Sequence, residues 1–175
     1  GDEVIIVDDG STDNTVEVLE PYRNRIRYLR GPHRGVGAAR NLGIAAATKP
    51  LVAFQDSDDE WMPDKLQVQR AFMQARPEVL FCFTDFWVRR ADGRPDTRHA
   101  LYYWHRDPRG WDAMLGPAVP YSTIAALPPG RADFPVHIGS LYLTQLRINY
   151  VASPSAVVRR AEAGDAFRFA EDISI

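Results

Sequence analysis

The stretch LVAFQDSDDEWMPDKL, residues 51–66, gives the strongest indication of the fold of this chain of 175 residues. It opens with a short apolar run, Leu51 to Phe54, which predicts a buried β-strand. Three aspartates follow within four positions, Asp56, Asp58 and Asp59, before the chain turns into a predicted helix. Carboxylates this close repel one another and are costly to hold together without a cation.

The spacing of the aspartates indicates what they bind. Asp56 and Asp58 fall on the same side of an extended chain, because side chains alternate along a strand. That arrangement suits a hard divalent ion whose shell is completed by phosphate oxygens. An acidic loop that only caps a helix is the simpler alternative. Its position at the carboxyl end of a strand in an α/β pattern favours ligand binding, since ligands bind there in such folds.

Strand and helix patterns alternate along the first half of the chain. Helical patterns separate the apolar runs: one has Val16, Leu19 and Tyr22 on a face, a small-residue one spans residues 38–47, and the last follows Pro63. This alternation predicts an α/β fold with a mostly parallel sheet, flanked by helices and joined by right-handed crossovers. The acidic clusters would then gather on one rim of the sheet. The predicted strands are residues 4–7, 26–29, 51–54, 79–88 and 150–160.

Composition limits the partners and the setting. Hydrophobic residues make up 45% and charged residues 25%, which is ordinary for a globular protein. The formal charge of −2 gives no electrostatic basis for binding nucleic acid or an anionic membrane. A single cysteine, Cys82, excludes a disulfide framework within the chain, and no apolar run predicts a membrane span. We therefore expect a reducing, cytoplasmic setting, and the abrupt ends lead us to expect an incomplete domain.

The second half of the chain is less regular. Turn signals and aromatic residues recur between residues 89 and 149. The aromatic residues either stack on a sugar or give apolar cover to the sheet. We expect one domain overall, with a regular α/β half over residues 1–88 and a less regular region over residues 89–175.

Other motifs fit less well. GVGAAR at residues 35–40 lacks the third glycine of a dinucleotide loop, so we interpret it as a tight turn into a helix beside which an arginine can meet a phosphate. A phosphorelay receiver domain would share an acidic pair after one strand and an acceptor aspartate, Asp56, after a later one. Receivers also need a lysine at the end of a following strand, and none follows Lys65. The receiver domain is the second hypothesis.

Three motifs in this order and spacing resemble glycosyltransferase family 2: EVIIVDDGSTDNT (residues 3–15), RGVGAARNLGI (residues 34–44) and the stretch LVAFQDSDDEWMPDKL. The late AED, residues 170–172, is similar to the acidic base motif of that family. The resemblance implies a GT-A-like (Rossmann-like) fold and an inverting, metal-dependent transferase of the hexosyltransferase type. It moves a sugar from a nucleotide-diphosphate sugar to an acceptor hydroxyl. A remnant that binds nucleotide sugars without catalysis is a further alternative.

The resemblance also implies that residues 1–88 are a nucleotide-sugar-binding half and residues 89–175 an acceptor-side region, and it implies roles for individual residues. Asp172 matches the catalytic base, and Mn²⁺ or Mg²⁺ would be held by Asp56, Asp58 and Asp59. The nucleotide-sugar-binding residues that it implies are Asp8, Asp9, Gly10, Ser11, Arg34, Gly35, Arg40, Asp56 and Asp58.

The expected partners follow from the same resemblance. A UDP-sugar is the favoured donor, with GDP or dTDP as other possible nucleotides, and the acceptor is a saccharide or another hydroxyl compound. The full-length protein is expected in the cytoplasm, with peripheral attachment to a membrane left open. The family usually begins with an earlier strand and helix that carry a Pro-x-Tyr-Asn-like segment, and nothing in this sequence matches it.

Overall fold

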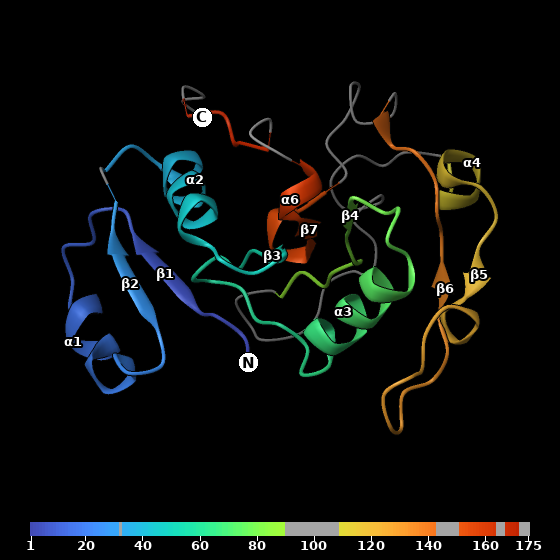
Figure 1. Cartoon of the computed structure of the whole chain (residues 1–175), viewed down its shortest axis with the longest axis horizontal. Helices are drawn as coiled ribbons and strands as arrows, with labels where there is room; N and C mark the ends of the chain where they lie inside the picture. Colours follow the sequence, from blue (N-terminus) through green and yellow to red (C-terminus); the bar gives the residue numbers. More distant parts are fainter. Residues whose placement is uncertain (32, 90–108, 143–150, 164–166, 172–175) are drawn as a thin grey trace. The chain divides into compact units, whose positions relative to one another are not determined.

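The computed structural model describes residues 1–31, 33–89, 109–142, 151–163 and 167–171 (Figure 1). The chain divides into two compact units. The first unit comprises residues 1–52 and 158–175, and the second comprises residues 53–157.

A pair of parallel strands begins the first unit. β1 (Ile5–Asp8) pairs in parallel with β2 (Arg27–Arg30), and the register joins Ile5 to Arg27. The connection between them contains α1 (Thr15–Leu19) and the 3₁₀-helix η1 (Glu20–Tyr22), drawn in blue in Figure 1. A parallel pair needs such a crossover, and a helix supplies it. The two predicted strands and the helix between them are confirmed.

The helix α2 (Val36–Ala46) covers β1 closely. A Cβ placed on Gly43 would lie 3.5 Å from the Val7 side chain, and Ala38 of the same helix is buried. Small residues allow this approach because they hold the helix backbone near the strand. Gly35 begins the helix with φ +89°, a left-handed conformation that favours glycine. The tight turn predicted from GVGAAR is confirmed.

A second, three-stranded sheet has the order β3-β7-β4. The division of the chain into two units falls within β3 (Leu51–Ala53) and β7 (Val157–Arg159). β4 is only Phe81–Cys82, so the prediction of a strand over residues 79–88 is wrong for residues 79–80 and 83–88. That run is not buried on both faces, since Trp87 is 55% exposed. A short helix, α6 (Arg160–Ala163), follows β7.

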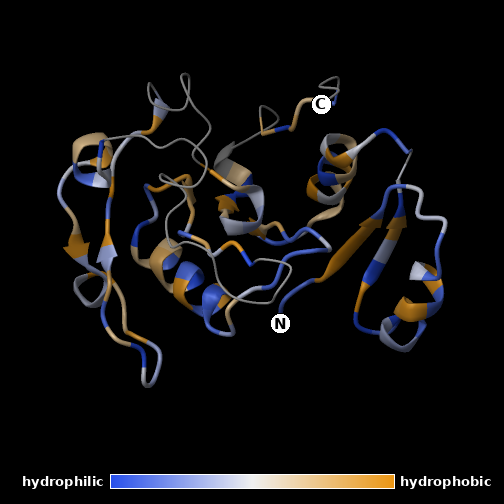
Figure 2. Cartoon of the chain, turned by 180° about the vertical axis from the view of Figure 1, so that it is seen from behind, coloured by the Kyte–Doolittle hydropathy of each residue, from blue (hydrophilic) through white to orange (hydrophobic). Residues whose placement is uncertain are grey.

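The core of the second unit forms on α3 (Lys65–Ala75). Val68, Phe72 and Met73 are buried on one face of this helix, and Figure 2 shows its apolar and hydrophilic residues interleaved. Tyr121 is 1% exposed and donates its hydroxyl to the Val68 carbonyl at 3.0 Å. Its ring stacks on Phe134 with centroids 4.7 Å apart. The predicted helix after Pro63 is confirmed.

Short elements occur where the sequence predicts none. β5 (Val119–Pro120) pairs antiparallel with β6 (Pro135–Val136), which lies at the other end of a loop. Two-residue strands lack the alternation that reveals longer strands in a sequence. The remaining elements of the second unit are α4 (Trp111–Leu115) and the 3₁₀-helices η3 (Tyr121–Thr123) and η4 (Ser153–Ser155). η4 lies within the strand predicted over residues 150–160, so that prediction is wrong there, and only β7 is a strand in the described part of the range.

Candidate active site

The turn after β1 is built around Asp8, which is 5% exposed. One oxygen of its carboxylate accepts hydrogen bonds from the backbone N–H groups of Gly10 (3.1 Å) and Ser11 (2.7 Å). The other oxygen accepts the hydroxyl of Tyr28 from β2. These bonds hold the pKa of Asp8 well below its usual range, and the Tyr28 hydroxyl is the largest cause. Asp8 thus holds the turn in shape.

Replacing Tyr28 with phenylalanine tests this arrangement. A hydrogen bond to a charged group contributes about 1.5–3 kcal/mol, so we expect the free energy of unfolding at pH 7 to fall by about that amount. Because the pKa of Asp8 is lowered by folding, its contribution is present above the ordinary pKa and is lost as the pH falls below it. The variant should therefore lose less stability than the wild type between about pH 5 and pH 3. Urea denaturation at both pH values measures this, with Tyr22→Phe on the exposed side of η1 as the control.

Asp9 joins this turn to the loop before α2. Its carboxylate accepts the backbone N–H groups of Arg34 (3.2 Å) and Gly35 (2.6 Å), which lie 25 and 26 residues further along the chain. Gly31 allows the approach, because a Cβ there would lie 2.6 Å from the Asp9 carboxylate. The structure thus brings together four predicted site residues: Asp9, Gly10, Arg34 and Gly35. A carboxylate has about four acceptor positions, so Asp9 keeps capacity for a ligand.

A segment near the C-terminus lies against α2. Asn41 exchanges two hydrogen bonds with the backbone of Phe169: its Oδ1 accepts the N–H at 2.8 Å and its Nδ2 donates to the carbonyl at 2.9 Å. The predicted Arg40 places its guanidinium 5.1 Å from the centre of the Phe169 ring. Arg34 pairs with Glu171 at 3.1 Å. Sequence reasoning missed Asn41, which lies in the RGVGAARNLGI motif, because its partners are 128 and 130 residues away.

Gly37 makes this contact possible. A Cβ there would lie 2.2 Å from the Ala170 carbonyl oxygen, and backbone atoms cannot move aside at low cost. We expect Gly37→Ala to lower the free energy of unfolding by about 1–3 kcal/mol, as overpacking does. Gly43→Ala is the matched control on the same helix. Its Cβ meets only Val7 at 3.5 Å, and its stability should stay unchanged or rise by up to about 1 kcal/mol. Equal losses in both variants would contradict the close contact.

The acidic loop after β3 belongs to the second unit. Asp58 and Asp59 are exposed and Asp56 is half-buried. The Asp59 N–H donates to the Asp56 carbonyl at 3.2 Å, and Gln55 donates its side-chain amide to the Asp59 carbonyl at 2.7 Å. Burial raises the pKa of the Asp59 carboxyl, and the charges of Asp58 and Asp56 raise it further. Partial burial and two neighbouring negative charges thus both disfavour ionisation of Asp59.

This donor set fits a hard divalent cation, because it offers carboxylate oxygens and mutual repulsion that a cation would relieve. Within the described ranges, no group of three or more His, Cys, Asp or Glu side chains forms a metal cage. Mg²⁺ commonly uses one or two carboxylates and completes its shell with phosphate oxygens and water. An open acidic loop fits that mode of binding.

The residues that follow the acidic loop are held in place by a series of side-chain contacts. Trp61 donates its indole N–H to the Pro154 carbonyl at 3.0 Å, and Lys65 lies 4.4 Å from the centre of its ring. Lys65 donates to Gln69 at 2.6 Å, and Gln69 donates to the Ser155 carbonyl at 2.9 Å. Burial lowers the pKa of Lys65 to about 8. These contacts fix the start of α3 relative to the loop.

The predicted residues thus fall into two groups. The first unit holds Asp8, Asp9, Gly10, Ser11, Arg34, Gly35 and Arg40, and the second unit holds Asp56, Asp58 and Asp59. Asp172 lies outside the described residues. The roles of all these residues, and the division into donor and acceptor regions at residue 88, stay predictions.

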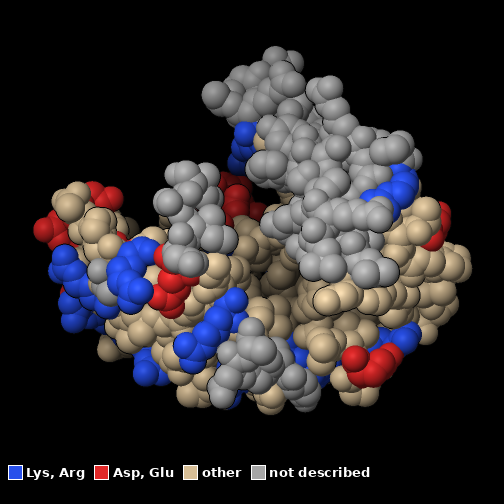
Figure 3. Space-filling view, turned by 90° about the horizontal axis from the view of Figure 1, so that it is seen from above, with Lys and Arg blue, Asp and Glu red and all other residues tan. Residues whose placement is uncertain are grey.

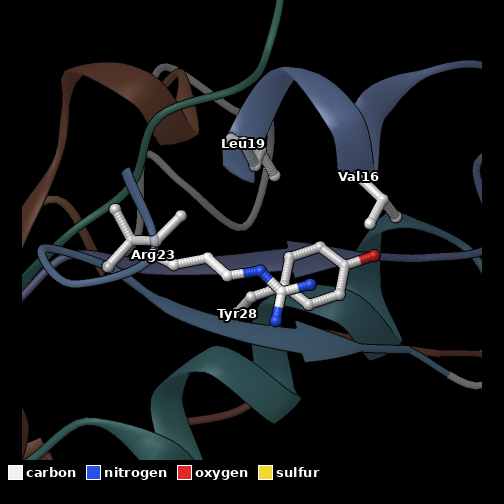
Figure 4. Close-up of a pocket in the computed structure, with 5 residues that line it drawn as sticks. Val16, Leu19, Arg23 and Tyr28 are labelled. Atoms are coloured by element: carbon white, nitrogen blue, oxygen red, sulfur yellow. The ribbon is translucent and has the colours of Figure 1, made fainter. Parts of the chain in front are cut away.

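The surface of the described residues adds two observations. A pocket of about 240 Å³ opens between α1 and β2, where Val16 and Leu19 face Tyr28 and the Arg23 side chain extends toward the tyrosine ring (Figure 4). Ile26 completes the lining of the pocket. None of the residues that line this pocket is a predicted site residue. Basic and acidic side chains both occur on the face drawn in Figure 3. In the part of the chain that the structure describes, no helix has the length and apolarity needed to cross a bilayer.

Comparison with known proteins identifies the family. The family model described as "Glycosyl transferase family 2" matches residues 1–127. The chain is 42% identical over 98 residues to "Putative teichuronic acid biosynthesis glycosyltransferase TuaG" of Bacillus subtilis, a match that covers 53% of this chain and 38% of TuaG. It is 32% identical over 90 residues to "UDP-Glc:alpha-D-GlcNAc-diphosphoundecaprenol beta-1,3-glucosyltransferase WfaP" of Escherichia coli, covering 50% of this chain and 36% of WfaP.

A solved structure supports the fold. The chain resembles residues 1–349 of S. aureus TarS with a TM-score of 0.60 and 23% sequence identity, over 99% of this chain and 42% of that one. The mixed α/β, GT-A-like fold that we predicted is confirmed, and the family match excludes the receiver domain. The chain spans well under half the length of the relatives named here. On the match over residues 1–127, the chain belongs to glycosyl transferase family 2.

Proposed function

We propose that the chain carries the donor-binding and catalytic residues of a metal-dependent, inverting glycosyltransferase that moves a hexosyl group from a nucleotide-diphosphate sugar to an acceptor hydroxyl. Family membership implies a donor and an acceptor of these classes. The observation that carries the finer proposal is the acidic loop after β3, where three aspartates lie within four positions and the Asp59 N–H donates to the Asp56 carbonyl at 3.2 Å. Such a loop is stabilised when a cation and a diphosphate bind there together.

The nucleotide would bind in the first unit. Asp9 accepts hydrogen bonds from two backbone N–H groups. Its carboxylate can accept a further hydrogen bond from an N–H group of the nucleobase. Asp8 holds the turn that contains Gly10 and Ser11 through their backbone N–H groups. Asp8 would therefore support nucleotide binding indirectly, by fixing the position of Asp9. Arg34 and Arg40 supply guanidinium groups on the same loop and helix, the chemistry that pairs with phosphate oxygens.

The diphosphate and its cation would bind at the acidic loop of the second unit. Asp56 and Asp58, with Asp59 beside them, would hold Mn²⁺ or Mg²⁺, and Asp56 and Asp58 would also meet donor hydroxyls. When bound, the cation neutralises the charge that develops on the departing nucleoside diphosphate. Relief of the repulsion at Asp59 favours the loaded loop.

The transfer itself requires a base. An acceptor hydroxyl is a poor nucleophile until a carboxylate takes its proton, and we assign that role to Asp172. As the proton moves to Asp172, the acceptor oxygen forms a bond to the anomeric carbon and the bond from that carbon to the diphosphate oxygen breaks. Attack opposite the leaving group inverts the anomeric configuration.

The nucleotide and the acceptor are further parts of the proposal. UDP is favoured because WfaP, by its name, uses UDP-Glc and makes a β-1,3 linkage. GDP and dTDP are the competitors, and the acceptor is a saccharide or another hydroxyl compound that residues 89–175 contact. A cytoplasmic setting is proposed on the single cysteine of the chain.

Turnover of UDP-glucose tests this function. We expect UDP release that requires Mn²⁺ or Mg²⁺ and stops with a chelator. With water as the acceptor, NMR should show that the first glucose formed has the anomeric configuration opposite to that of the donor. Retained configuration, or release that is equal without a divalent ion, would overturn the proposal. UDP binding with no turnover of any tested donor would instead support the non-catalytic remnant.

A further inference from the structure

The last described segment, residues 167–171, is held on α2 by one side chain. Asn41 uses its carboxamide as a backbone group does in a sheet, accepting from the Phe169 N–H at 2.8 Å and donating to the Phe169 carbonyl at 2.9 Å. The carboxamide also donates to the Glu171 carboxylate at 2.8 Å. We call Asn41, Phe169 and Glu171 the Asn41 clamp.

Both carboxylate oxygens of Glu171 are engaged. Its Oε1 accepts from Asn41, and its Oε2 lies 3.1 Å from the guanidinium of Arg34. Arg34 in turn donates its backbone N–H to Asp9. The segment is therefore tied to the loop that Asp9 holds as well as to α2.

Two further contacts fix the segment. The Arg40 guanidinium lies over the Phe169 ring at 5.1 Å, and Gly37 leaves room for the Ala170 carbonyl. Hydrogen bonds, an ion pair, a cation–π contact and close backbone packing therefore act on three consecutive residues, Phe169 to Glu171. Asp172 is the next residue in the chain.

We propose that Asn41 is a positioning residue for the transfer reaction. The Asn41 clamp fixes the backbone up to Glu171, the residue that precedes the proposed base in the chain, and Glu171 is an anchor that does not itself take the proton. This inference rests on the proposed function, in which Asp172 is the base. A misplacement of about 1 Å can cost about 100-fold in rate, which is why a side chain that touches no substrate can control turnover.

Hydrogen exchange of the Phe169 amide tests the clamp directly. In Asn41→Ala this amide loses its acceptor, and the loss of one or two net hydrogen bonds predicts exchange that is about tenfold faster. Asn24→Ala, in the exposed turn before β2, is the matched control and should leave exchange at Phe169 unchanged. Unchanged exchange in Asn41→Ala would overturn the clamp, whatever the activity of the protein.

Kinetics then separate positioning from a purely structural role. Asn41→Ala should lower kcat by about 10–100-fold, the cost of losing a group that orients a functional residue, and leave the Kd for UDP within about twofold. Asn41→Asp should be worse, because it faces the Glu171 carboxylate. The double variant Asn41→Asp/Glu171→Gln should recover part of kcat, since the new amide can donate to the new carboxylate. A parallel loss of UDP binding, or no recovery in the double variant, would overturn the positioning role.

The Asp172→Asn variant distinguishes the two failures. If Asp172→Asn loses turnover and Asn41→Ala does not, the positioning role is wrong and the proposed function stands. If Asp172→Asn keeps normal turnover, the base assignment is wrong, and with it the role of the clamp in catalysis, even where exchange at Phe169 responds as expected.

Discussion

Asp58→Asn is expected to reduce UDP affinity in the presence of Mn²⁺ by at least about 100-fold, since even outer-shell partners of metal ligands are worth 10–100-fold. The substitution keeps the size of the side chain and removes one carboxylate from the acidic loop. Asp58 is exposed, and its charge raises the pKa of Asp59, so its loss does not endanger the fold. Calorimetric titration with UDP at fixed Mn²⁺ measures the change, and the unfolding midpoint should stay close to that of the wild type.

Glu60→Gln is the matched control for Asp58→Asn. It removes one negative charge two positions away, from an exposed side chain that pairs with Arg89 at 3.2 Å. If both variants weaken binding equally, the effect is one of general charge and the metal role of Asp58 is wrong. Unchanged affinity in Asp58→Asn would also contradict that role.

Asp172→Asn is expected to lower kcat by about 10²–10⁴-fold, the usual contribution of a general base. The amide cannot take a proton from the acceptor hydroxyl, whereas the donor does not need that proton transfer to bind. The Kd for UDP should therefore remain within about twofold of the wild type. Nucleotide release and calorimetry on the same protein give the two values.

Glu17→Gln on the exposed side of α1 is the control for Asp172→Asn. A kcat for Asp172→Asn close to that of this control would place the base elsewhere. A fall in kcat matched by an equal fall in UDP affinity would assign Asp172 to donor binding instead.

The elements that the sequence predicted well are those whose signal is local. The apolar runs before Asp8 and Asp56 form strands. The helices α2 and α3 begin within two residues of Gly35 and Pro63, respectively. Period and turn chemistry are properties of neighbouring residues, so a single sequence carries them.

The strand predicted over residues 79–88 failed because a strand is completed by its partner. β4 pairs only at Phe81–Cys82, beside the three-residue strand β7. Hydrogen-bonding partners that lie far away in the sequence leave no mark on the apolar pattern of the run itself.

The candidate site was predictable as residue types and not as contacts. The aspartates at the ends of β1 and β3 stand out because carboxylates this close together repel one another and are costly to hold without a cation. The Asp8 carboxylate accepts hydrogen bonds from Tyr28, Gly10 and Ser11. The sequence could not predict the bond from Tyr28, because Tyr28 lies 20 residues away on another strand. The Asn41 clamp was missed for the same physical reason, with a separation of 128 residues.

Calorimetric titration of the protein with UDP, with and without Mn²⁺, tests whether the acidic loop binds the nucleotide together with a cation. We expect Mn²⁺ to tighten UDP binding by about 100-fold or more, because a cation held by the carboxylates of the acidic loop would offset the charge of the diphosphate. GDP and dTDP titrated in the same way identify the preferred nucleotide. Equal affinity for UDP with and without Mn²⁺ would contradict the account.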